Sequence, residues 1–324
     1  MKNLHKIDLF NVDLEVGKQI KHLPLFYQTF GQSIQDSPVV LVNHALTGNS
    51  QVMGENGWWN ELIGSGKTID TEKYCVIAFN IPGNGFDGDP ENLIKNYKDF
   101  TTKDIASIFW QGLDFLKVTA LFSVIGGSLG GGIAWEMTFL RPKNIQHCIP
   151  IATNWKATDW LIANVLVQDA ILNNSKNPIH DARLHAMLLY RTPQSLKEKF
   201  NIQKEENQEV FQIESWLMHH GNKLQNRFRL QAYKLMNHLL KTIGSTIVME
   251  SWESFIQQTE SSIHLIAVNS DYFFTADENR DTYDEFKKTN LKIRYHEIDS
   301  IHGHDAFLIE FEQLGVFLKP IFSK

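Results

Sequence analysis

The sequence predicts an α/β fold in which helices cover both faces of a mostly parallel sheet and a helical segment is inserted into it. Short apolar runs rich in β-branched residues recur along the chain, at residues 38–42, 74–79, 121–125, 145–152, 263–268 and 293–298. Stretches with helical spacing separate most of these runs, which is the pattern of parallel strands that are buried on both faces. This alternation stops between residues 154 and 261, where helical spacing continues with little strand signal.

Helices are expected between the strands, at residues 101–117, 129–140 and 276–289. Pro142 follows the middle one and marks its end, because proline cannot continue a helix. A chain of 324 residues suits one large domain with an insertion. We therefore expect an α/β core made of residues 1–153 and 262–324, with residues 154–261 as a helical lid.

Composition narrows the class of protein. The net charge is −6 and no run of Lys or Arg exceeds two residues, so no nucleic-acid footprint is visible. The first residues are too polar for a secretion signal, and no stretch has the length of a membrane span. Cys75 and Cys148 lie inside apolar runs and are expected to be buried free thiols. These features predict a cytoplasmic protein that binds neither nucleic acid nor membrane.

A glycine-rich pentapeptide carries the strongest chemical signal. Gly126-Gly-Ser-Leu-Gly130 follows a predicted strand and opens a predicted helix. This is the context of a nucleophile elbow, in which a sharp turn presents a serine at the N-terminus of a helix. Glycine neighbours leave room for the strained turn. The motif predicts Ser128 as a nucleophile on an α/β-hydrolase fold.

A serine needs a base and an orienting carboxylate, and this fold orders them Ser, then Asp or Glu, then His. Asp271 and His304 follow the two last predicted strands and complete a triad in that order. His302 lies in the same loop, but His304 is preferred because Asp305 and an expected helix start at residues 306–309 follow it. A metal bound by this His/Asp cluster is an alternative, although no further ligand cluster supports it.

The oxyanion hole of such a site uses two backbone N–H groups. One belongs to the residue after the nucleophile, here Leu129. The other comes from a loop after an early strand, and residues 43–48 are the candidate. We choose Leu46 within that loop.

Several short motifs follow one another along nearly the whole chain. They are His44–Gly48, Gly57–Trp59, Ile63-Gly64, Ile69–Thr71, Ile125–Gly131, Ala182-Arg183, Tyr190-Arg191, Glu214-Ser215, Asn226–Phe228 and Gly303–Phe307. With these motifs in this order, the sequence resembles the homoserine O-acetyltransferases of methionine biosynthesis.

The resemblance implies an acyltransferase with Ser128, Asp271 and His304 as its triad and Leu46 as an oxyanion donor. It also implies that Arg183 and Tyr190 reach from the lid into the substrate site and that Asp305 meets the substrate's ammonium group; Thr47 is counted with these substrate-binding residues. The implied substrates are L-homoserine and acetyl-CoA, with no permanently bound cofactor and no metal. Similar family members are homodimers that pack through lid helices.

Two segments depart from the family pattern. Residues 80–89 replace a usual Gly-Gly-Cys turn, and Arg229-Leu-Gln-Ala-Tyr233 replaces a usual Asp-Ala-Asn-Ser-Tyr. The donor could therefore be succinyl-CoA, and the acceptor could be serine. A serine esterase, which needs the triad but no charge pair for an amino acid, is the alternative of another reaction class.

Overall fold

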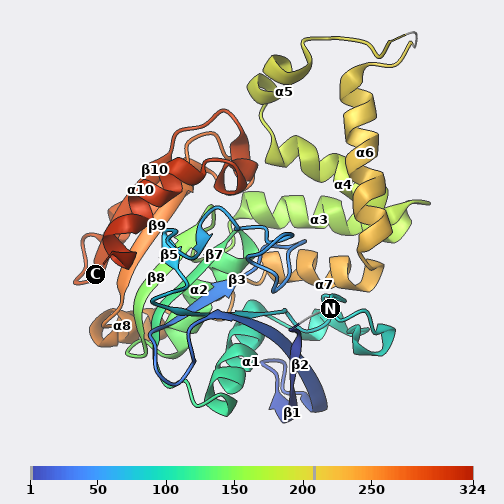
Figure 1. The fold of residues 1–324 in the computed structure, drawn as a ribbon. Coiled ribbons are helices and arrows are strands. Elements are labelled where there is room, and N and C mark those ends of the chain that lie inside the picture. Colours follow the sequence, from blue (N-terminus) through green and yellow to red (C-terminus); the bar gives the residue numbers. More distant parts are fainter. Residues whose placement is uncertain (1–2, 207–208, 324) are drawn as a thin grey trace.

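A computed structural model describes residues 3–206 and 209–323 of the chain. Its centre is an eight-stranded sheet with the order β1-β2-β6-β3-β7-β8-β9-β10 (Figure 1). The strands are β1 (His5–Asp13), β2 (Gln19–Gly31), β3 (Val39–Asn43), β6 (Cys75–Phe79), β7 (Leu121–Gly127), β8 (Ile145–Ile151), β9 (Ser262–Val268) and β10 (Lys292–Ile298). The last six are parallel, and β1 and β2 are antiparallel. A separate pair joins β4 (Ile63–Gly64) to β5 (Ile69–Asp70).

Helices cover both faces of this sheet. The α-helices are α1 (Thr102–Phe115), α2 (Leu129–Leu140), α3 (Asp159–Asn174), α4 (Pro178–Tyr190), α5 (Pro193–Phe200), α6 (Gln212–Arg227), α7 (Leu230–Leu240), α8 (Met249–Gln258), α9 (Ala276–Phe286) and α10 (Phe311–Phe322). Within the described ranges, short 3-10 helices lie at Pro90–Asn92, Tyr97–Asp99 and Gly303–Leu308. In the described part of the chain, no helix is both long enough and apolar enough to cross a bilayer.

Each central strand contributes to two separate apolar cores. In β3, Val39 and Leu41 join the core under α1, α2 and α9, whereas Val40 and Val42 join the core under α10. Successive side chains of a strand point to opposite faces, so a strand that is covered on both faces must be apolar at every position. This requirement explains the uninterrupted apolar runs of the sequence.

The predicted lid lies between β8 and β9 and contains α3 to α8. Helices α4, α5 and α6 stand away from the sheet, whereas α7 lies close to it (Figure 1). Helix α8 packs on the core, with the Phe255 ring 4.3 Å from Phe139 of α2 and the Trp252 ring 4.4 Å from Phe286 of α9. The boundaries 154–261 thus enclose both projecting helices and helices that cover the sheet.

The sequence reasoning missed the β1–β2 hairpin. Ile7, Leu9 and Val12 of β1 are buried, as are Leu23, Leu25 and Gln28 of β2. In β1, Ile7 and Leu9 alternate with polar residues, whereas residues 23–27 of β2 form a short apolar run that contains Pro24. The alternation in β1 and this run in β2 were the available signals.

Candidate active site

The loops that carry the predicted catalytic residues all follow carboxyl ends of parallel strands. Leu46 follows β3, Ser128 follows β7, Asp271 follows β9 and His304 follows β10. Because parallel strands point the same way, these ends meet at one edge of the sheet. The topology therefore brings residues from distant parts of the sequence to one site.

Ser128 occupies a strained turn between β7 and α2. Its backbone has φ 56° and ψ −126°, outside the regions that a non-glycine residue prefers. A Cβ on Gly126 or Gly130 would overlap neighbouring main chain, and one on Gly127 would overlap the Phe307 ring. The elbow therefore needs its glycines for close packing, as the motif predicted.

The three predicted triad residues are joined by two consecutive hydrogen bonds. Nε2 of His304 lies 2.9 Å from Oγ of Ser128, and Nδ1 lies 2.7 Å from Oδ2 of Asp271. The other carboxylate oxygen of Asp271 accepts from the N–H groups of Phe273 and Phe274, at 2.7 and 3.0 Å. All three triad side chains are buried. An ionised Asp271 fixes the proton on Nδ1 and leaves Nε2 free to accept the serine proton.

His302, the other histidine of this loop, has a different set of partners. Its Nδ1 lies 3.0 Å from a guanidinium nitrogen of Arg191 and 3.0 Å from Oγ of Ser195. The geometry therefore joins His304, and not His302, to Ser128. The α-helix expected from residue 306 begins at Phe311, and His304 sits in the preceding 3-10 turn, so the helix start was predicted too early.

The loop after β3 lies directly against the first turn of α2. A Cβ on Gly130 would overlap the main chain of Asn43, and the Asn43 amide donates to the Gly130 carbonyl at 3.3 Å. Leu129 is the first residue of α2, where N–H groups have no partner within the helix. This placement brings the Leu46 loop and the Leu129 N–H to the same end of the nucleophile helix.

Helix α4 brings the predicted lid residues to the triad. The Tyr190 ring lies 5.4 Å from the His304 ring, and burial raises the pKa of its phenol to about 12. The Arg183 guanidinium lies 5.5 Å from the centre of the Tyr190 ring. Burial also raises the pKa of Asp305, and the positive charge of Arg183 opposes that shift. Neither charge forms an ion pair within the described part of the chain.

Thr47 is contacted from the lid by a residue of the motif Asn226–Phe228 to which the sequence reasoning gave no role. Arg227, at the end of α6, donates to the Thr47 carbonyl at 3.1 Å. Trp160 in α3 likewise donates its indole N–H to the carbonyl of Tyr272, next to Asp271, at 2.6 Å. Thr192, after α4, donates to the Ile301 carbonyl at 2.5 Å. The lid thus contacts each of the three loops around Ser128 through a side-chain hydrogen bond, a feature with no sequence signal.

The two departures from the family pattern are neighbours in space. A Cβ on Gly85 would lie 3.4 Å from Cγ of Arg229, so the Arg229 stem packs against the segment at residues 80–89. The Arg229 side chain is exposed. Its guanidinium has no ion-pair partner in the described residues.

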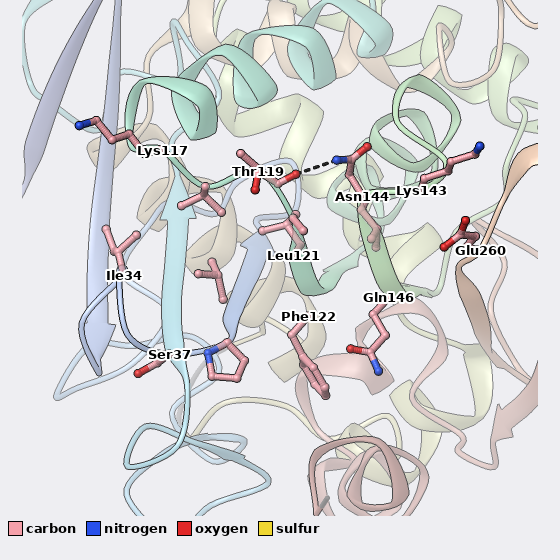
Figure 2. A pocket seen from close by; sticks show the side chains of 15 residues that line it. Ile34, Ser37, Lys117, Thr119, Leu121, Phe122, Lys143, Asn144, Gln146 and Glu260 are labelled. Carbon is pink, nitrogen blue, oxygen red and sulfur yellow. Dashed lines mark hydrogen bonds between the residues drawn. The ribbon is translucent and has the colours of Figure 1, made fainter.

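A pocket of about 530 Å³ lies at the opposite edge of the sheet (Figure 2). Val39, Leu121 and Ile145, the first residues of β3, β7 and β8, line it. Lys117 and Lys143 also contribute, and the Asn144 amide donates to the Thr119 carbonyl at 2.8 Å. The catalytic loops follow the other ends of these strands, so this pocket is separate from the candidate active site.

The fold, with a hydrogen-bonded Ser128, His304 and Asp271 in loops that follow parallel strands, is that of the α/β-hydrolase class. A family model described as "alpha/beta hydrolase fold" matches residues 38–254, which confirms the predicted fold. A homoserine O-acetyltransferase of Cyclobacterium marinum is 32% identical over 96% of this chain and 92% of its own length. The chain therefore belongs to the homoserine O-acetyltransferase family of acyltransferases, as its motifs predicted.

Solved structures share the whole architecture. The homoserine O-acetyltransferase of Bacillus anthracis matches with a TM-score of 0.87 at 18% identity, over 100% of this chain and 99% of that one. The L374D mutant of esterase E22 matches equally well, with a TM-score of 0.87 at 16% identity, over 99% of this chain and 100% of that one. At such identities the likeness shows the fold alone, so the reaction must be argued from the site.

Proposed function

We propose that this protein transfers an acetyl group from acetyl-CoA to the hydroxyl of L-homoserine through an acetyl-Ser128 intermediate. The observation that carries the proposal is the position of the hydrogen-bonded Ser128, His304 and Asp271 beside Arg183 and Asp305. Neither of these two opposite charges has an ion-pair partner among the described residues. A hydrolase that acts on neutral esters needs the triad but not the charges.

In the first half-reaction, His304 accepts the Ser128 proton at Nε2 while Oγ attacks the thioester carbon. The N–H groups of Leu46 and Leu129 stabilise the oxyanion that forms. The C–S bond breaks, and the thiolate leaves with the proton from His304. Asp271 stabilises the transient imidazolium.

In the second half-reaction, His304 removes the proton from the homoserine hydroxyl, whose oxygen attacks the acetyl carbon. The bond to Ser128 breaks and Oγ recovers the proton. Arg183 binds the carboxylate of the amino acid and Asp305 binds its ammonium group, so that the hydroxyl is placed over the ester. Tyr190 fills the space between Arg183 and His304, and Thr47 contributes to the same site.

The test is a transfer assay with purified protein, L-homoserine and acetyl-CoA, in which thiol release and product mass are followed. Without an acceptor, intact mass should show one added acetyl group in the wild-type protein and none in Ser128→Ala. Succinyl-CoA as donor, L-serine as acceptor and water as acceptor are run in parallel. Turnover of acetyl-CoA to free acetate alone would replace the transferase with an esterase.

We also propose that two copies of the chain pair through their lids. Helix α3 buries Leu161 and Val165, yet its opposite face is apolar as well. A surface helix is normally polar on its outer face. Exposed apolar side chains on α3, α4 and α6 are Trp160, Ile162, Leu166, Val167, Leu188 and Met218. Light scattering of wild type and Leu166→Glu tests the pairing, and a monomeric wild-type protein would contradict it.

A further inference from the structure

His44 is a buried histidine that the proposed mechanism does not use. It is 1% exposed. In the chain it follows Asn43, the last residue of β3, and precedes Leu46 by two residues. Burial lowers its pKa to about 4, so the imidazole is neutral at neutral pH. A neutral imidazole carries one N–H and one acceptor nitrogen, and the partners determine which is which.

The partners of His44 leave one possible tautomer. Its Nδ1 lies 2.8 Å from the Ala45 carbonyl oxygen, which can only accept. Its Nε2 lies 3.0 Å from the N–H of Ile81, which can only donate. The proton therefore resides on Nδ1. Hydrogen bonds run in one direction, from the Ile81 N–H through the imidazole to the Ala45 carbonyl.

The Ala45 carbonyl shares a peptide plane with the Leu46 N–H. That peptide is trans, since the described residues contain no cis bond, so the N–H points away from the carbonyl. The Gly48 N–H also donates to the Ala45 oxygen, at 2.9 Å. Two donors on one oxygen fix the plane and polarise the peptide, which makes its N–H a stronger donor.

We infer that His44 is a positioning residue for the oxyanion hole: its Nδ1–H orients and polarises the peptide that carries the Leu46 N–H. This inference rests on the proposed acyl-serine mechanism. Ile81 belongs to the segment at residues 80–89 that departs from the family pattern. Through the Ile81 N–H, this segment fixes the His44 tautomer and thereby affects the oxyanion hole.

Two substitutions separate the hydrogen bond at Nδ1 of His44 from the contacts at Nε2, to which the Asn84 amide also donates at 3.4 Å. In His44→Asn the amide nitrogen occupies the position of Nδ1 and keeps a donor for Ala45. In His44→Gln the amide reaches the position of Nε2, accepts from Ile81 and loses the donor to Ala45. His238→Gln is the matched control, because His238 is also neutral, with a pKa lowered to about 4 by burial, and lies on α7.

The measurement is the single-turnover rate of CoA release from acetyl-CoA, together with KM for L-homoserine and the melting temperature. We expect His44→Gln to acylate about 10- to 100-fold more slowly, since loss of a whole oxyanion donor costs about 100- to 1,000-fold. His44→Asn should recover most of that rate, and KM should change less than about twofold in either variant. Equal rates for His44→Gln and wild type, or equal losses in the two variants, would overturn the inference.

A second measurement does not depend on the folding of any variant. Nitrogen-15 NMR of the wild-type histidines should show His44 neutral and protonated on Nδ1 at pH 6. A His44 proton on Nε2 would overturn the inference. Failure of wild type to form acetyl-Ser128 would instead overturn the proposed function, and the positioning role with it.

Discussion

Arg183 and Tyr190 lie two turns apart on α4 and face the same space, with the guanidinium carbon 5.5 Å from the ring centre. The ring in turn lies against His304. A helix of 3.6 residues per turn places residues seven apart on one side, so one face of α4 presents both groups to the site. The cation is thereby held near the reacting atoms without an ion-pair partner in the described residues.

We predict that Arg183→Ala and Asp305→Ala slow the acceptor half-reaction far more than the acylation of Ser128. Each change leaves a charge of the bound amino acid unpaired, at a cost of about 2–4 kcal/mol. Rapid mixing with acetyl-CoA, then with L-homoserine, measures the two steps separately. Normal turnover of homoserine in both variants would show that these charges do not bind the acceptor.

The preferred donor is predicted to be acetyl-CoA, by at least about tenfold in kcat/KM over succinyl-CoA. A succinyl group adds a carboxylate that needs its own cation in a closed site. In the proposed mechanism Arg183 binds the carboxylate of the amino acid, and Arg229 is exposed. Both donors are therefore assayed with wild type and Arg229→Ala. A succinyl preference that disappears in the variant would assign the second cation to Arg229.

Gly127→Ala should reduce both stability and activity. Its methyl group would overlap the ring of Phe307, three residues beyond His304. Overpacking of this kind costs about 1–3 kcal/mol, and movement of Phe307 would shift the catalytic loop. Gly315→Ala in α10 is the control, because its nearest contact would be an ordinary 3.4 Å from Thr68. A Gly127→Ala protein with unchanged melting temperature and kcat would contradict the packing argument.

Stability should fall as pH drops from about 6.5, partly because of His264. Burial, assisted by neighbouring positive groups, lowers the pKa of this side chain to about 3. The unfolded chain then binds more protons below its ordinary pKa of about 6.5, so the stabilising contribution is complete above that pH and is lost toward acid. Urea unfolding at pH 7.5, 6.0 and 5.0 measures this loss.

His264→Gln cannot take up the proton, so its free energy of unfolding should approach that of wild type as the pH falls. If the difference in free energy of unfolding between wild type and His264→Gln stays constant across the three pH values, His264 contributes nothing to the loss of stability in acid.

The sequence identified the six parallel strands to within one or two residues, because burial on both faces requires a continuous apolar run. It also located Ser128, since the elbow is a local motif whose glycines are adjacent in the chain. Asp271 and His304 were predicted from the order Ser, Asp, His in which this fold places its triad along the chain. By contrast, the β1–β2 hairpin was missed, because β1 gives only an alternating pattern and Pro24 stands within the apolar run of β2.

The sequence favoured His304 over His302 through the residues that follow His304, but only the tertiary structure shows what each histidine contacts. The tertiary structure also places Arg229 against Gly85, joins Arg227 to the Thr47 carbonyl and determines the tautomer of His44. Each of these relationships joins residues far apart in the sequence. Local sequence patterns therefore determined most of the elements and the predicted nucleophile, whereas the packing of loops from different strand ends decided how the other side chains surround Ser128.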